Sequence, residues 1–125
     1  MANWSSNLQK IYSMNCNITY SPQFAKELKR LAKKYKSIKQ DYAELLNELR
    51  NNPLIGTDLG SNLRKIRMAI TAKGKGKRGG ARVITYTVIF TTEDYDIKLL
   101  TIYDKSEREN ITDKELQLIL KENGL

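Results

Sequence analysis

Histidine is absent from this sequence. Histidine is the side chain whose ordinary pKa lies nearest neutral pH, so its absence excludes Ser-His-Asp and Cys-His catalytic sites and metal sites that depend on imidazole. Any acid–base catalysis near neutral pH must therefore use Lys, Tyr, Asp or Glu side chains whose pKa is shifted by their surroundings.

Cysteine and long hydrophobic runs are also scarce. Cys16 is the one cysteine among 125 residues, which excludes a disulfide framework and a multi-cysteine zinc site and is typical of a reducing cytoplasm. No apolar run approaches the ~20 residues of a membrane-spanning helix, and residues 1–16 lack the basic start and apolar core of a secretory signal. We expect a cytoplasmic protein without membrane contact, metal or cofactor. An N-terminal extension over residues 1–16 would precede a single domain over residues 17–125.

Acidic residues are missing from one long segment. Between Asp58 and Glu93 the chain contains no Asp or Glu, and residues 64–82 carry eight Lys and Arg side chains. The whole protein has 22 basic and 14 acidic residues, so removing these eight cations leaves 14 against 14. The entire net charge of +8 is thus concentrated in 19 consecutive residues, which indicates a binding site for a polyanion.

The first part of the domain predicts a strand and a helix. Residues 17–20 have a period of two, which places Ile18 and Tyr20 on the inward face of a short strand. Ser21 is then an N-cap residue in front of a proline, and the apolar spacing that follows predicts an amphipathic helix over residues 22–35.

A second helix follows at once. Ser37, with Gln40 three residues later, predicts a capping box that opens this helix, and Pro53 limits its end. Two helices with so short a link should pack as an antiparallel hairpin. We interpret residues 54–62 as a loop.

The second half of the domain is rich in strands. From residue 63 the period changes to two, so Lys65 and Arg67 should share one face of a strand whose other face is apolar. A glycine-rich loop leads to a strand over residues 82–90, and a turn leads to the next strand over residues 97–103.

A final helix is predicted by a capping box of Thr112 and Glu115. The expected order is β-α-α-β-β-β-α. This order predicts an α+β protein in which an antiparallel sheet carries the helical hairpin on one face and leaves the other face for a partner.

Three stretches of the chain carry a family resemblance. They read NPLIGTDLG from residue 52, LRKIRMAITAKGKGKRGGARVITY from residue 63, and LLTIYDKSERENIT from residue 99. Together they resemble the RelE/ParE superfamily of bacterial type II toxins, most closely the HigB-like branch of mRNA interferases. The resemblance implies a RelE-like (microbial ribonuclease-like) fold, cleavage of messenger RNA in the ribosomal A site, and a cognate antitoxin, expected to be a helix-turn-helix protein.

The resemblance also implies a set of catalytic residues. In RelE-type toxins two basic residues with an isoleucine between them line the active strand, an arginine follows the hairpin, and a basic cluster follows the last strand. These features fall on Lys65, Arg67, Arg82, Lys105 and Arg108.

Metal-free RNA cleavage requires three chemical roles, because the 2′-hydroxyl must lose a proton, the phosphorane must be neutralised and the leaving 5′-oxygen must gain a proton. Arginine suits the middle role, since its planar fork binds two phosphate oxygens and keeps its charge. Our hypothesis is that Arg67 and Arg82 hold the phosphate while Lys65 and Lys105 transfer protons. Further candidates for proton transfer are Tyr86, Tyr103 and Glu107.

The glycine-rich loop is a candidate surface for ribosomal RNA. Cations on such a loop would contact the phosphate backbone without reading sequence. The predicted RNA-binding residues are Lys73, Lys75, Lys77, Arg78, Tyr86 and Tyr103.

Two other functions remain open at this point. A ParE-like inhibitor of DNA gyrase would share the fold without chemistry of its own, and Arg67 in place of the lysine of RelE keeps that alternative open. A plain RNA-binding module would use the cationic strand for docking alone. The basic strand together with Arg82 and Lys105 favours the nuclease.

Overall fold

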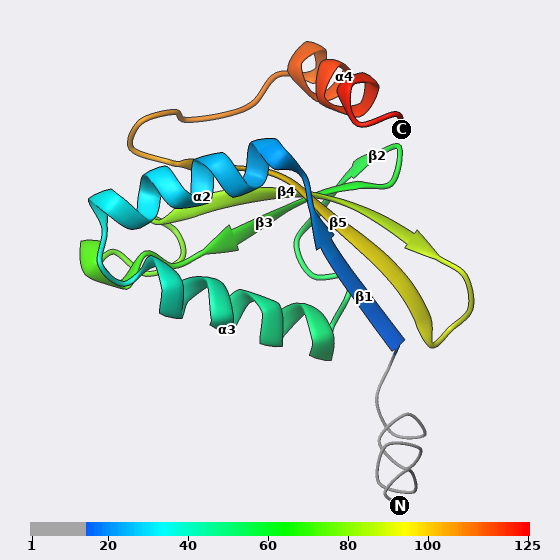
Figure 1. Ribbon diagram of the computed structural model, residues 1–125, viewed down its shortest axis with the longest axis horizontal. Helices are drawn as coiled ribbons and strands as arrows, with labels where there is room; N and C mark the ends of the chain where they lie inside the picture. Colours follow the sequence, from blue (N-terminus) through cyan, green and yellow to red (C-terminus); the bar gives the residue numbers. More distant parts are fainter. Residues whose placement is uncertain (1–14) are drawn as a thin grey trace, which may run out of the picture.

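The computed structural model describes residues 15–125, and the extension residues before Asn15 lie outside the described part. Figure 1 shows one twisted sheet with helices packed against it. The elements in chain order are β1 (Asn15–Tyr20), α2 (Pro22–Lys34), α3 (Ile38–Asn51), β2 (Thr57–Gly60), β3 (Leu63–Met68), the 3-10 turn η1 (Thr71–Lys73), β4 (Ala81–Ile89), β5 (Asp94–Asp104) and α4 (Asp113–Glu122).

The five strands form one sheet in the order β1-β5-β4-β3-β2. The predicted antiparallel meander is present as β3, β4 and β5, and the α+β class is confirmed. The sheet is mixed rather than wholly antiparallel, because β1 pairs with β5 in parallel. The first strand begins at Asn15, two residues before the expected start.

The predicted loop over residues 54–62 contains a strand that sequence reasoning missed. Residues 57–60 form β2, which pairs antiparallel with β3 through a two-residue turn at Ser61 and Asn62. Both turn residues have positive φ, of 53° and 66°, as a type I′ hairpin turn requires. Ser-Asn is an uncommon pair in that turn, which favours Asn-Gly, Asp-Gly or Gly-Gly, so the sequence gives only a weak hairpin signal.

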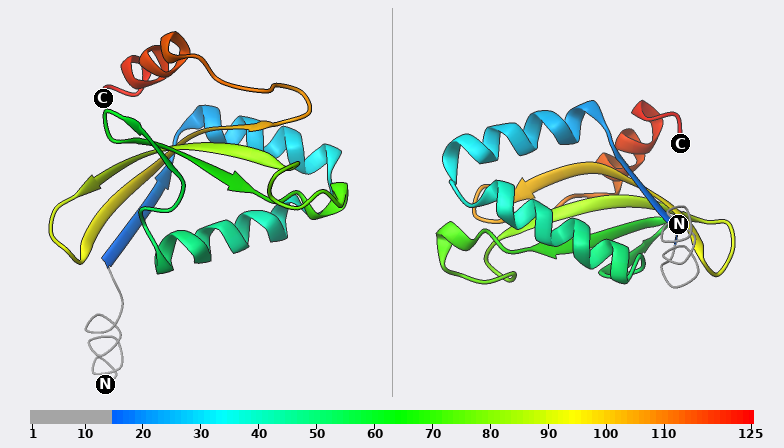
Figure 2. Two further views of the ribbon diagram at one scale, coloured as in Figure 1. Left: turned by 180° about the vertical axis from the view of Figure 1, so that it is seen from behind. Right: turned by 60° about the horizontal axis from the view of Figure 1, so that its bottom comes forward.

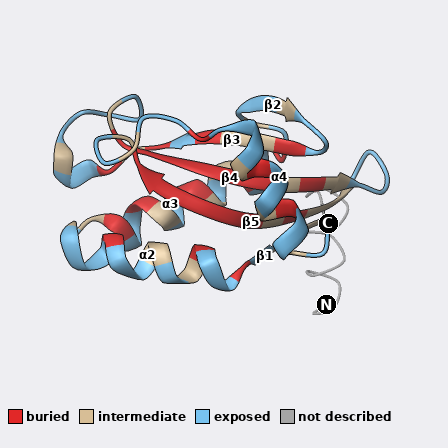
Figure 3. Ribbon diagram, turned by 90° about the horizontal axis from the view of Figure 1, so that it is seen from above, coloured by how far each residue is buried: buried red, intermediate tan, exposed pale blue. Residues whose placement is uncertain are grey.

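Two apolar clusters hold the fold together, one on each face of the sheet. The larger cluster joins α2 and α3 to residues such as Val83 and Leu99, and the smaller one joins α4 to residues such as Ile84 and Leu100. In the left view of Figure 2 the strands lie between α4 and α3, and Figure 3 shows burial concentrated along β4 and β5. The face expected to be left for a partner is therefore partly covered by α4.

Ser21 joins the start of α2 to an irregularity in β5. Its Oγ accepts a hydrogen bond from Phe24 N at 3.0 Å, which is the predicted N-cap, and donates to the carbonyl of Leu100 at 2.8 Å. Leu100 is the extra residue of a β-bulge, since Ile84 pairs with Thr101 while the next residue of β4 pairs with Leu99. The serine thus satisfies a carbonyl group that the sheet leaves unpaired.

Two local predictions for the helical half are corrected. Ser37 precedes α3, but its side chain makes no capping hydrogen bond. It donates to Asp41 instead and accepts from the backbone of Ala72, so a tertiary contact has replaced the cap. Tyr20 contacts the ring of Phe24 but remains 59% exposed, because β1 is an edge strand.

Within residues 15–125, none of the helices has the length and apolar character needed to cross a membrane.

Replacing Ser21 by alanine should lower the free energy of unfolding by about 2 kcal/mol, because a cap is lost and a buried carbonyl is left unpaired. Thr112→Ala is the matched control, since Thr112 also caps a helix but is exposed, and it should cost about 1 kcal/mol. Urea denaturation measures both values. An equal loss in the two variants would contradict the role assigned to the bulge.

Candidate active site

The basic side chains gather on the face of the sheet opposite α2 and α3. Along β3, Ile66 and Met68 enter the larger apolar cluster, so the alternating Lys65 and Arg67 point to the other face. Arg82 of β4 lies directly opposite Arg67 in the register of the two strands. Strand pairing therefore brings three of the predicted catalytic cations together.

These cations line a cleft of about 550 Å³, whose lining residues are Thr57, Lys65, Arg67, Arg82, Lys105, Glu109 and Asn110. Four cations and one carboxylate give the cleft a charge of +3, which suits a phosphate-bearing ligand. In the described part of the chain, no group of three or more His, Cys, Asp or Glu side chains could hold a metal ion. Four of the five predicted catalytic residues share this one cleft.

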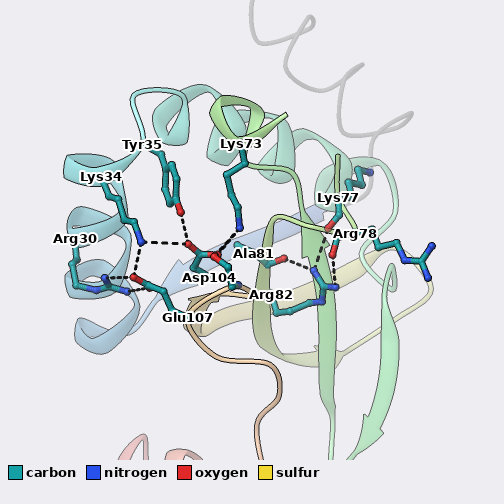
Figure 4. Close-up of polar contacts among 11 residues, drawn as sticks. Arg30, Lys34, Tyr35, Lys73, Lys77, Arg78, Ala81, Arg82, Asp104 and Glu107 are labelled. Atoms are coloured by element: carbon teal, nitrogen blue, oxygen red, sulfur yellow. Dashed lines mark hydrogen bonds and ion pairs between the residues drawn. The ribbon is translucent and has the colours of Figure 1, made fainter. Parts of the chain in front are cut away.

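Arg82 is the buried cation of the cleft, with 4% of its surface exposed. Its Nη1 donates to the carbonyl oxygens of Lys77 and Ala81, both at 3.1 Å, and its Nη2 donates to that of Arg78 at 2.9 Å (Figure 4). Burial lowers the pKa of Arg82 below its ordinary value, and the charge of Arg67 lowers it further. Because arginine still keeps its proton near neutral pH, Arg82 places a fixed positive charge in the cleft.

Asp104, at the end of β5, is a fully buried carboxylate that binds several donors. Its Oδ2 accepts from Tyr35 Oη at 2.6 Å, and its Oδ1 accepts from Lys73 Nζ at 2.8 Å and from the backbone and hydroxyl of Ser106 (Figure 4). Burial by itself raises the pKa of Asp104, but the hydrogen bonds from Lys73, Tyr35 and Ser106 outweigh it and hold that pKa well below its usual range. Asp104 is therefore ionised at neutral pH.

Lys105 is positioned by the turn that follows β5. It follows Asp104 directly, and its backbone nitrogen donates to the carbonyl of Gly80 at 3.0 Å. The turn after β5 is thereby joined to the start of β4, and the Lys105 side chain enters the cleft beside Arg82.

The glycine-rich segment at residues 71–80, expected to be a loop, is anchored to α3 at its start. The buried Asp41 of α3 accepts from the backbone nitrogen of Thr71 at 3.0 Å and from its hydroxyl at 2.6 Å. The backbone of Ala72 donates to Ser37 Oγ at 2.9 Å. These contacts, with those of Arg82 at the far end, hold the segment on both sides.

The four loop cations differ in their availability to RNA. The Lys73 side chain is 9% exposed and its ammonium group is bound to Asp104, so RNA binding by Lys73 stays a prediction that would require this ion pair to open. Lys77 forms an ion pair with Glu48 of α3 at 2.6 Å. Lys75 and Arg78 are exposed, and no side-chain hydrogen bond or ion pair is found for either one among the described residues.

The remaining candidates are not among the residues that line the cleft. Arg108 pairs with Glu115 of α4, donates to the carbonyl of Asn110 at 3.0 Å, and lies 5.6 Å from the ring centre of Tyr103. Tyr103 is only 6% exposed and Tyr86 packs against the smaller apolar cluster. Arg108 therefore connects the last helix to the sheet, and Tyr103 presents no face for base stacking, contrary to the expectation.

Known proteins resemble this chain in sequence and in fold. The family described as the RelE toxin of the RelE/RelB toxin-antitoxin system matches residues 23–123. The chain belongs to the RelE toxin family. A solved structure of an E. coli RelE toxin mutant in the free state is similar in fold, with a TM-score of 0.52 and 15% identity, and the similarity covers 77% of this chain and 90% of that one. The chain is thus a toxin of the RelE/ParE superfamily, as the resemblance predicts.

Three residues of the cleft in this RelE-family toxin were missed. Thr57 belongs to the unrecognised strand β2, while Glu109 and Asn110 lie in the irregular segment between β5 and α4. Lys65 Nζ lies 3.5 Å from Asn110 Oδ1, which ties that segment to β3. Neither periodicity nor a local motif marks the segment, so no sequence signal could have placed it over the sheet.

Asp104→Asn should lower the free energy of unfolding at pH 7 by about 3 kcal/mol, because it leaves the nearly buried charge of Lys73 without its partner. The folded-state pKa of Asp104 lies below its ordinary value of 3.8, so the carboxylate stabilises the toxin above that pH and loses this effect as the pH falls below it. The difference between wild type and variant should therefore shrink from pH 7 to pH 3 in urea denaturation.

Glu107→Gln is the control for that measurement, since Glu107 forms partly exposed ion pairs with Arg30 and Lys34 and should cost much less. A difference for Asp104→Asn that stays constant with pH would contradict the assignment.

Proposed function

We propose that this toxin is an endoribonuclease that cleaves messenger RNA on the ribosome and so inhibits translation. The observation that carries the proposal is the single cleft in which Lys65, Arg67, Arg82 and Lys105 meet. The reaction is attack of a ribose 2′-hydroxyl on the adjacent phosphorus, with the cations stabilising the phosphorane.

The contacts of the cleft cations suggest different tasks. Arg67 is exposed and makes no hydrogen bond or ion pair with a residue of the described chain, so its planar fork is free to bind two oxygens of the scissile phosphate. Arg82 is fixed beneath the cleft by three backbone carbonyls and contributes charge rather than reach. Lys65 and Lys105 carry the exchangeable protons.

The ribosome would be contacted outside the cleft. Lys75 and Arg78 project from the anchored loop and are exposed, as contacts with a phosphate backbone require. Such contacts orient the toxin while the messenger enters the cleft.

The family pairs its toxins with antitoxins, and we propose that a cognate antitoxin, encoded beside this toxin and carrying a helix-turn-helix domain, neutralises it. Within the superfamily we assign the chain to the HigB-like branch on its sequence resemblance. Co-purification of the toxin with the product of the adjacent reading frame tests the partner.

Arg67→Ala should reduce mRNA cleavage by about 100-fold or more, because one preorganised charge on the transition state is lost. Primer extension on messages in a cell-free translation reaction measures the cleavage. Arg50→Ala removes an exposed arginine from α3 and should leave cleavage unchanged. Full activity of the Arg67 variant would refute the assigned role. If the toxin caused loss of gyrase-dependent DNA supercoiling without any mRNA cleavage, that result would favour a ParE-like inhibitor.

A variant with alanine at both Lys75 and Arg78 should bind ribosomes more weakly and with a shallower salt dependence, reduced by about 1–2 in the slope of log affinity against log salt. Sedimentation with ribosomes at several salt concentrations measures the slope. A double variant of Lys114 and Lys121 removes the same charge from exposed positions on α4 and should keep the wild-type slope. Equal slopes in all three proteins would exclude the loop as a contact.

A further inference from the structure

Glu109 is the one carboxylate among the residues that line the cationic cleft. It comes from the irregular segment between β5 and α4, which crosses the outer face of the sheet. Lys65 and Arg67 of β3, Arg82 of β4 and Lys105 of the turn after β5 line the same cleft. An ionised carboxylate only accepts, whereas lysine ammonium and arginine guanidinium groups only donate, so Glu109 is the one charged side chain of this cleft suited to accept a proton.

The backbone at Glu109 is held from both sides. Arg108 is tied to α4 by Glu115 and to the carbonyl of Asn110. Asn110 Oδ1 accepts from Ile111 N at 2.9 Å and lies 3.5 Å from Lys65 Nζ. The residue between these two anchors is therefore positioned at the cleft by its neighbours.

Glu109 itself is free for chemistry. The nearby carboxylates are occupied, since Asp104 binds Lys73, Glu107 binds Arg30 and Lys34, and Glu115 binds Arg108. Glu109 is exposed and forms no hydrogen bond or ion pair with another residue of the described range 15–125. A carboxylate kept only for stability would be expected to have such a partner.

We propose that Glu109 is the general base of the cleavage reaction. This inference rests on the proposed endoribonuclease function. The proton of the 2′-hydroxyl passes to a Glu109 carboxylate oxygen as the 2′-oxygen forms its bond to phosphorus. The bond from phosphorus to the 5′-oxygen breaks, and Lys65 or Lys105 gives that oxygen a proton. The products are a 2′,3′-cyclic phosphate and a 5′-hydroxyl, and Arg67 neutralises the phosphorane between them.

This role and a purely electrostatic one predict opposite effects of the neutral variant. Glu109→Gln raises the positive charge of the cleft from +3 to +4, so RNA should bind at least as well as before. If Glu109 only modulates binding, kcat should stay constant while KM falls. If Glu109 is the base, kcat should fall because the proton acceptor is missing, while KM stays constant or falls.

The test is single-turnover cleavage of messenger RNA on programmed ribosomes by the full-length toxin. Glu109→Gln should lower kcat about 100-fold or more, and Glu109→Asp should recover part of that loss. Glu44→Gln, an exposed carboxylate on α3, is the matched control and should keep the wild-type rate.

Three results would overturn the proposal. If Glu109→Gln cleaves mRNA at a rate within about threefold of wild type, Glu109 is not the general base, whatever the other variants do. A lowered KM with unchanged kcat assigns Glu109 to binding alone. If wild type and Glu44→Gln both bind ribosomes without cleaving mRNA, the proposed nuclease function is refuted and this inference with it. If wild type and Glu109→Gln both cleave mRNA, only the inference is refuted.

Discussion

The burial of Arg82 opposite Arg67 is the constraint on which the site depends. Two like charges on adjacent strands repel each other, and a buried guanidinium must replace its lost hydration. Three backbone carbonyls of residues 77, 78 and 81 supply that replacement, so the cation is stable only when the glycine-rich segment is folded over it. The requirement to bury Arg82 thus determines the shape of the segment before it, and that segment in turn contacts α3 through Asp41 and β5 through Asp104.

This arrangement separates rigid cations from accessible ones. The Arg82 side chain and the Lys105 backbone each form hydrogen bonds with backbone carbonyl groups. These bonds give the cleft the fixed geometry that catalysis needs. Lys75 and Arg78 lie on the outside of the same segment, where they can contact a large polyanion without disturbing the cleft. One continuous basic stretch therefore supplies both a reaction site and a docking surface, and Glu109 adds the acceptor that cations cannot provide.

Much of the fold was predictable because it depends on local periodicity. The helices α2, α3 and α4 and the meander of β3, β4 and β5 follow from apolar spacing, and Ser21 caps α2 as expected. The errors arise where a distant contact competes with a local motif. Ser37 gives up its cap for a contact with Ala72, thirty-five residues away. The strand β2 depends on a turn whose residue pair gives a weak signal, and the parallel pairing of β1 with β5 joins segments that are far apart in the sequence.

The sequence by itself determined that the positive charge is concentrated in one segment, that histidine takes no part, and that Lys65 and Arg67 share a face. These properties need only composition and a period of two. Only the tertiary structure decided which cations are free, because Lys73 and Lys77 find their partners 31 and 29 residues away and Arg108 is taken by α4. It also placed Glu109 in the cleft, since an irregular segment has no periodicity and its position depends on the surfaces it crosses.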